Sequence, residues 1–169
     1  MNGNLERTEV LISSANQIIV PKMYMLVSGV GDARFALNAF DRALCDAGVG
    51  DLNLVKVTSI LPPQAVPGLR ADIPDGAVVF AAVGSITSSQ PGELLSAAVA
   101  VGIPTDKSAP GVLMEGSARK SASILEEEVR YMAEVGLRDR GLDVADIRSV
   151  SAEHRVIQAG AAFAAVLLW

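Results

Sequence analysis

The sequence predicts an α+β fold in which two helices pack on a mostly antiparallel sheet. Six or seven apolar segments have the length of strands and are bounded by Gly and Pro, the residues that punctuate turns. Two longer segments instead repeat apolar residues at helical spacing. The length of 169 residues fits one domain, residues 1–169, with a core of its own.

The first part of the chain predicts a strand, a turn and a helix. Residues 17–27 are predicted as a strand, and the glycines of residues 29–31 as a turn. Asp32 is suited to cap a helix that continues to Gly48, which would stop it. The apolar stripe of this helix is expected to comprise four residues at helical spacing: Leu37, Phe40, Leu44 and Ala47.

The middle of the chain predicts strands separated by one loop. Alternating or continuous apolar residues predict strands over residues 51–60, 77–86 and 112–115. Pro62-Pro63 ends the first of these, and the Pro- and Gly-rich residues 64–76 form the loop. Residues 94–103 are apolar except for Ser96, which fits a strand or a buried helix. Proline near both ends favours the strand.

Residues 117–141 form the clearest predicted helix. Its core-facing positions are expected to be Leu125, Val129 and Met132. Two i,i+4 ion pairs are expected on its solvent face, Glu126 with Arg130 and Glu134 with Arg138. Residues 147–157 and 161–168 are predicted as the closing strands.

Composition restricts the classes of partner. Half of the residues are apolar, which favours a homo-oligomer that buries surplus apolar surface between subunits. The net charge of −5 argues against nucleic acid as a partner. No apolar run has the length of a membrane span, and polar residues 1–7 do not resemble a secretory signal. The single cysteine, Cys45, suits a reducing compartment, so we expect a cytoplasmic protein.

Most polar residues have an ordinary structural interpretation. The Gly29-Val30-Gly31 segment lacks the rest of a phosphate-binding fingerprint, and no metal-ligand spacing occurs. Glu153 and His154 would point to opposite faces of a strand, which argues against an acid–base pair. Asp41 borders the first helical stripe and Glu115 ends a predicted strand. Pattern alone predicts no chemistry for either residue.

Three groups of residues resemble the pyruvoyl-dependent arginine decarboxylase family. The first runs from Leu37 to Leu44 and continues through Asn53-Leu54-Val55 and Val57-Thr58-Ser59-Ile60-Leu61-Pro62-Pro63. The second is Pro91-Gly92-Glu93 with Gly111-Val112-Leu113-Met114-Glu115, and the third is Glu153-His154 with the segment from Ala161 to Trp169. The resemblance extends from about Met25 to the C-terminus. The family often has Ser-Ser where this chain has Thr58-Ser59, and the hydroxyl of the second residue is retained.

The resemblance implies αββα-type subunits assembled as a homotrimer, or as a dimer of trimers. It implies autocatalytic cleavage between Thr58 and Ser59, giving a β chain of residues 1–58 and an α chain of residues 59–169. Ser59 would become the pyruvoyl cofactor, and Asn53 would assist the cleavage. The implied reaction converts L-arginine to agmatine and CO2.

The same resemblance gives roles to three further residues. Glu115 would donate a proton to the substrate α-carbon, Asp41 would bind the guanidinium, and Leu44 would line the substrate's aliphatic stem. An extended chain would place Asn53 and Ser59 roughly 20 Å apart, so the site is expected to form between subunits. Three alternatives stay open: the same chemistry on another amino acid such as histidine, an uncleaved non-catalytic relative, or a binding protein without chemistry.

Overall fold

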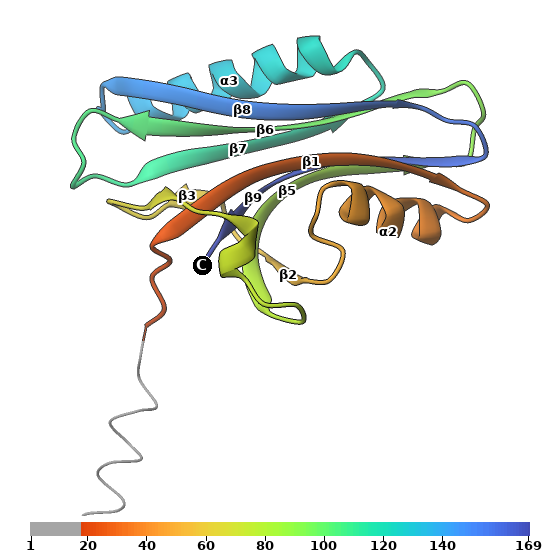
Figure 1. The fold of residues 1–169 in the computed structure, drawn as a ribbon. Coiled ribbons are helices and arrows are strands. Elements are labelled where there is room, and N and C mark those ends of the chain that lie inside the picture. The colour runs from red at the N-terminus through yellow and green to blue at the C-terminus, as the bar shows by residue number, and fades with distance from the viewer. Residues whose placement is uncertain (1–17) are drawn as a thin grey trace, which may run out of the picture.

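The protein forms four layers, with two β-sheets stacked between two helices (Figure 1). The structure is a computed structural model that describes residues 18–169. Helix α2 (Ala36–Asp46) covers the outer face of one sheet, and helix α3 (Ala122–Arg138) covers the outer face of the other. The αββα layering and the α+β class are therefore confirmed.

The sheet beneath α2, called sheet A, has five strands in the order β2-β5-β9-β1-β4. Its three long strands pair antiparallel: β1 (Met23–Ala33) and β5 (Val78–Ser88) lie on either side of β9 (Ala159–Leu168). The two short edge strands pair parallel with their neighbours, β2 (Asn53–Lys56) with β5 and β4 (Val66–Pro67) with β1. Sheet A is therefore mixed rather than purely antiparallel.

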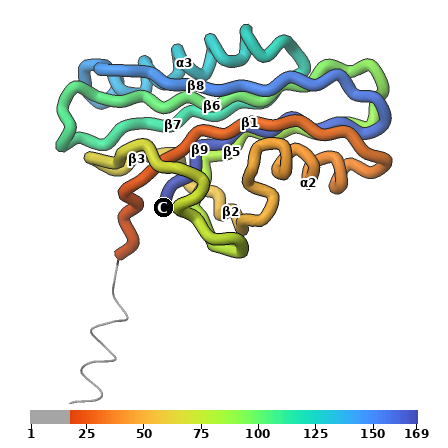
Figure 2. The backbone as a smooth tube through the Cα atoms, in the orientation of Figure 1, coloured from red at the N-terminus to blue at the C-terminus, as the bar shows by residue number. Residues whose placement is uncertain are grey.

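The sheet beneath α3, called sheet B, has four antiparallel strands in the order β3-β7-β6-β8. Its long members are β6 (Leu94–Pro104), β7 (Gly111–Ala118) and β8 (Val144–Arg155). The two-residue strand β3 (Ile60–Leu61) pairs with β7 at one edge, as the tube in Figure 2 also shows. Strand β6 is buried along nearly its whole length, which explains why all of its residues except Ser96 are apolar.

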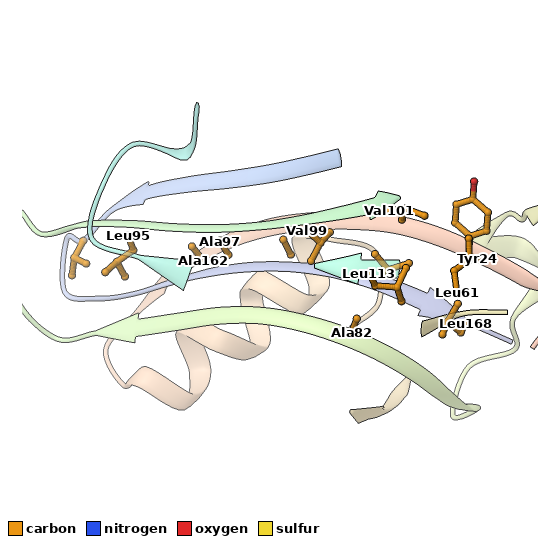
Figure 3. Close-up of a cluster of buried hydrophobic side chains, with 13 residues drawn as sticks. Tyr24, Leu61, Ala82, Leu95, Ala97, Val99, Val101, Leu113, Ala162 and Leu168 are labelled. Carbon is orange, nitrogen blue, oxygen red and sulfur yellow. The ribbon is translucent and has the colours of Figure 1, made fainter. Parts of the chain in front are cut away.

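The core between the sheets is built largely from alanine, valine and leucine. Figure 3 shows this cluster, with Ala97 of β6 lying near Ala162 of β9 and with Leu168 of β9 lying at the other end, near Leu61. Small residues let the two sheets approach closely. At Gly84 of β5, for example, a Cβ atom would overlap the carbonyl oxygen of Gly116 in the opposite sheet.

The predicted turn at residues 29–31 is wrong, because these residues lie inside β1. Helix α2 packs closely on this part of the strand. Gly29 and Gly31 lie inside β1, where a Cβ at Gly31 would stand 2.7 Å from the Ala43 nitrogen. These glycines therefore serve helix–sheet packing rather than a turn. The residues of α2 fully buried in this contact are Ala39 and Ala43.

The predicted stripe and cap of this helix are partly wrong. Leu37 is 78% exposed, whereas Phe40, Leu44 and Ala47 do pack against the sheet A core. Asp32 lies in β1 instead of capping the helix, because its carboxylate binds the turn between β8 and β9. Gly48 follows the helix end with a φ of 74°, as the sequence predicted.

Most other predicted elements are confirmed, with four corrections. The 64–76 loop also contains β4 and a short 3-10 helix, Arg70–Asp72. Helix α3 begins at Ala122, and Met132 is 44% exposed while Ala133 and Leu137 fill the core positions. Glu126 accepts hydrogen bonds from Ser149 and Ser151 rather than pairing with Arg130.

Three further observations bear on the expectations from sequence. Glu134 and Arg138 form the expected ion pair, at 2.5 Å. Within residues 18–169, neither helix is long and apolar enough to cross a membrane. The predicted strand over 17–27 starts outside the described residues and is observed from Met23 onward.

Candidate active site

The chain passes from sheet A to sheet B at Thr58. The predicted strand over 51–60 is in fact two strands, β2 in sheet A and β3 in sheet B. Val57 still donates its N–H to Ala81 of β5, whereas the Ser59 carbonyl already accepts from Leu113 of β7. Thr58 is therefore the single residue between two backbones that are fixed in different sheets.

This crossing distorts the backbone at Ser59. Its φ is 66°, in the left-handed region that a residue with a Cβ rarely adopts. Conformations of this kind cost about 1–3 kcal/mol and persist only where the surroundings hold them. Here the neighbouring hydrogen bonds to β5 and β7 hold the residue on both sides.

The Ser59 hydroxyl contacts both oxygens of the Glu115 carboxylate. The Oγ–Oε distances are 2.8 and 3.0 Å, so the hydroxyl donates to a carboxylate that lies within proton-transfer distance. Glu115 is in β7, two residues after the core residue Leu113 and on the same face of the strand. Thus the β3–β7 pairing brings together two residues that are 56 positions apart.

Cavities flank Ser59 on two sides. One of about 300 Å³ has apolar walls that include Ile60, Leu113, Met114 and Met132, and also contains Ser59, Glu115 and Arg140. The other, of about 200 Å³, is formed by apolar residues around Thr58 and Ser59, including Ile19, Phe80 and Leu168. A small molecule therefore has access to both sides of the Thr58–Ser59 junction.

The structure does not bring the remaining predicted site residues to Ser59 within one subunit. Asn53 begins β2, and its side-chain nitrogen donates to the Gly76 carbonyl at 2.8 Å. Asp41 is exposed on α2, which lies at the opposite end of the molecule from β3 (Figure 1). Leu44 lines an apolar pocket of about 310 Å³ between α2 and sheet A, together with Phe40, Leu54 and Lys56.

Sequence reasoning missed two polar features. Arg140, two residues after the end of α3, lines the cavity that contains Ser59 and Glu115, and no spacing in the sequence distinguishes it from other arginines. Asp32 binds His154 Nε2 at 2.9 Å and also the backbone N–H groups of Ile157 and Gln158. Burial opposes ionisation of Asp32, but these hydrogen bonds outweigh it and lower the pKa of its carboxyl.

The Asp32–His154 contact confirms that His154 does not pair with Glu153. The Glu153 carboxylate instead accepts from the Ala122 N–H at the start of α3, on the other face of β8. Asp32 and His154 join the ends of β1 and β8, far along the sheets from β3. They stabilise the structure and lie outside the Ser59 site.

Comparison with known proteins gives a family for this site. A sequence profile described as pyruvoyl-dependent arginine decarboxylase matches residues 23–167. Relatives of that name include a protein from Methanocaldococcus jannaschii, 43% identical over 150 residues, and one from Methanococcus aeolicus, 46% identical over 149 residues. The alignments cover 89% and 88% of this chain, and 91% and 90% of the relatives.

Similarity extends to a more distant relative of the same name. The protein from Methanopyrus kandleri is 38% identical over 152 residues, covering 89% of this chain and 98% of the relative. The matched region contains both helices, every strand except the last residue of β9, and the residues Ser59, Glu115 and Arg140.

Proposed function

The chain belongs to the pyruvoyl-dependent arginine decarboxylase family, and on that premise we propose that it converts L-arginine to agmatine and CO2 with a pyruvoyl group made from Ser59. The observation that carries the assignment of Ser59 is its contact with Glu115 at a strained junction between two sheets. A nucleophile, a proton acceptor and an accessible scissile bond are thereby brought together.

The residues at the junction fit a cofactor generated from the chain itself. Conversion of a serine to pyruvoyl requires that its hydroxyl attack the preceding carbonyl, so the hydroxyl must lose its proton. The Ser59 hydroxyl donates this proton in a hydrogen bond to Glu115, which is placed to accept it. Thr58 is exposed, so its carbonyl carbon can be reached and its carboxylate can leave. The unfavourable φ of Ser59 raises the energy of the uncleaved chain.

Cleavage would proceed through an ester. The Ser59 Oγ attacks the Thr58 carbonyl carbon, and the C–N bond between Thr58 and Ser59 breaks. An ester to the Ser59 Oγ replaces the amide, and the Ser59 nitrogen becomes a free amine. Loss of the Ser59 α-proton then expels the Thr58 carboxylate and leaves dehydroalanine at position 59. Hydrolysis of dehydroalanine releases ammonia and gives the pyruvoyl group, so the chain is divided into residues 1–58 and 59–169.

Decarboxylation uses the same carboxylate a second time. The ketone of a pyruvoyl group supplies an electron sink for the carbanion that remains when CO2 leaves. Glu115 lies next to position 59, so its Oε atoms are placed to donate a proton to the substrate α-carbon. The apolar walls of the cavity, including Leu113 and Met114, would limit competing proton transfer from water.

Recognition of the guanidinium is proposed to involve a second subunit. Asp41 and the apolar pocket lined by Leu44 lie at the far end of the subunit from Ser59. In a head-to-tail homotrimer, as a single ring or paired into a dimer of trimers, α2 of one subunit would meet Ser59 of the next. Asn53 would also act across this boundary in the cleavage. A carboxylate such as Asp41 accepts two parallel hydrogen bonds from a guanidinium, which lysine cannot supply.

The test combines intact mass with substrate selectivity. Wild-type protein should separate into fragments of about 6 and 12 kDa, in proportion to 58 and 111 residues of a 17.6 kDa chain. Ser59→Ala should remain one chain, because it lacks the nucleophile. CO2 release should be faster from arginine than from lysine, ornithine or histidine, and Asp41→Asn should reduce that preference about tenfold to a hundredfold.

A matched control separates charge at the site from charge in general. Glu127→Gln removes an exposed carboxylate from α3 and should leave both cleavage and selectivity unchanged. Wild-type protein that stays intact at neutral pH, or that releases CO2 fastest from another amino acid, would contradict the proposal.

A further inference from the structure

Arg140 is the charged residue of the Ser59 cavity to which the proposed reaction gives no role. It follows the C-terminal end of α3, where the helix cap is Asp139. Among the described residues that line this cavity, Arg140 carries the one positive charge and Glu115 the one negative charge. A guanidinium and a carboxyl group at one small apolar cavity suit a ligand that has a polar group for each of them.

The guanidinium of Arg140 is held in place by the helix. Its Nη1 donates to the Gly136 carbonyl at 2.6 Å, one of the carbonyls left without a partner at a helix C-terminus. The negative end of the helix dipole also favours a cation there. Within residues 18–169, no carboxylate forms an ion pair with Arg140, so the rest of its planar donor fork is available to a ligand.

Arginine bound at Ser59 must place its α-carboxylate near Glu115. The carboxylate is attached to the α-carbon, the atom that Glu115 would protonate, so it enters the apolar cavity beside Glu115. A cation in the same cavity offsets the cost of placing a negative charge there, and a guanidinium matches carboxylate geometry. The substrate's own guanidinium, a chain length away, would be bound by Asp41.

We propose that Arg140 binds the α-carboxylate of the incoming arginine and thereby distinguishes the substrate from its decarboxylated product. The inference rests on the proposed function and adds a specificity residue to it. Agmatine lacks the carboxylate, so the contact exists before CO2 leaves and is lost afterwards. A contact made in the bound substrate lowers KM without raising kcat.

The direct test measures binding of ligands that cannot react. The first ligand, 5-guanidinopentanoate, is arginine without its α-amine, and the second, butylguanidine, lacks the carboxylate as well. Calorimetry on cleaved wild-type protein should show tighter binding of the carboxylate ligand. Arg140→Met should weaken its binding by about 10- to 100-fold and leave butylguanidine unchanged. In steady state, KM for arginine should rise by a similar factor, with kcat changed by less than about twofold and inhibition by agmatine unaffected.

Two further variants separate ligand binding from a purely structural role. Arg140→Gln removes the charge but keeps an amide donor for the Gly136 carbonyl, and it should show the same loss as Arg140→Met. Arg138→Met is the matched control, since the Arg138 guanidinium pairs with Glu134 on the solvent face. This control should bind both ligands as wild type does.

The outcomes distinguish the inference from the function on which it rests. If cleaved, active protein binds the carboxylate ligand equally well in wild type, Arg140→Met and Arg140→Gln, the inference is wrong and the decarboxylase assignment stands. If wild-type protein is neither cleaved nor able to bind either ligand, the proposed function fails and the inference fails with it.

Discussion

Replacing Glu115 with glutamine tests whether this carboxylate takes the proton of Ser59 during self-cleavage. Both carboxylate oxygens lie within 3.0 Å of the Ser59 Oγ, so either can accept the proton as the hydroxyl attacks Thr58. A glutamine amide has nearly the same shape and can accept the hydrogen bond through its oxygen. It cannot accept the proton at neutral pH, so Glu115→Gln removes the base while preserving the packing.

The expected magnitude follows from the proton transfer alone. A positioned general base contributes about 10²–10⁴-fold, which corresponds to about 3–5 kcal/mol of activation free energy. Glu115→Asp should give an intermediate rate. It retains the carboxylate but shortens the side chain by one carbon–carbon bond, about 1.5 Å, so the contact with Ser59 would open.

The assay is a time course of fragment formation on a denaturing gel, begun with freshly purified precursor at neutral pH. Glu115→Gln should convert to two fragments at least about 100 times more slowly than wild type. Its melting temperature should stay close to that of uncleaved Ser59→Ala, because neither change alters the fold. Cleavage of Glu115→Gln at the wild-type rate would show that another group removes the Ser59 proton.

Two more predictions concern the scaffold. Gly31→Ala should destabilise the protein by about 1–3 kcal/mol, because its Cβ overlaps the α2 backbone, and should raise KM for arginine by displacing Asp41; thermal melting and steady-state kinetics test this. Asp32→Ala should cost about 2–4 kcal/mol at pH 7, measured by urea unfolding, because three hydrogen bonds are lost. Since the folded-state pKa of Asp32 is lowered, the deficit should be complete above the unfolded carboxyl pKa of about 3.9 and should shrink as pH falls further.

The elements that the sequence predicted well are those whose pattern of apolar residues reflects their burial in the fold. Strands β6 and β9 are buried on both faces or nearly so, and their nearly continuous apolar composition identifies them. Helix α3 is amphipathic and was also identified, although its start was placed too early. These features depend on burial, which side-chain chemistry reflects directly.

The errors arose where tertiary contacts, rather than local preference, decide the conformation. Gly29 and Gly31 have the composition of a turn, but their meaning depends on a helix that packs against them. The change of sheet at Thr58 leaves no trace in the alternating pattern of residues 51–60. Asp32 has the composition of a helix cap, but its partners lie more than 120 positions away.

The candidate site was found by resemblance, since local pattern predicts no chemistry for Ser59 or Glu115. Their pairing depends on the two-residue strand β3 lying beside β7, a contact between distant segments that one sequence does not encode visibly. Asp41 and Asn53 lie apart from Ser59 within the subunit, so their part in the site stays a prediction about assembly. Arg140 was missed because a single arginine near the end of a predicted helix has no distinctive spacing.

The strand order of sheet A affects how the protein could refold after the proposed cleavage. Strands β2 and β1 would belong to the shorter fragment, and β5, β9 and β4 to the longer, so the order β2-β5-β9-β1-β4 interleaves the two polypeptides. No backbone ladder is lost by the cut, because Thr58 lies between the sheets. Refolding after denaturation, however, would require the two separate fragments to associate and to pair their strands in alternation. The yield of refolding would therefore depend on protein concentration. Maturation would therefore be irreversible. The uncleaved chain folds as one polypeptide, and the cleaved enzyme would stay folded because its unfolding is slow.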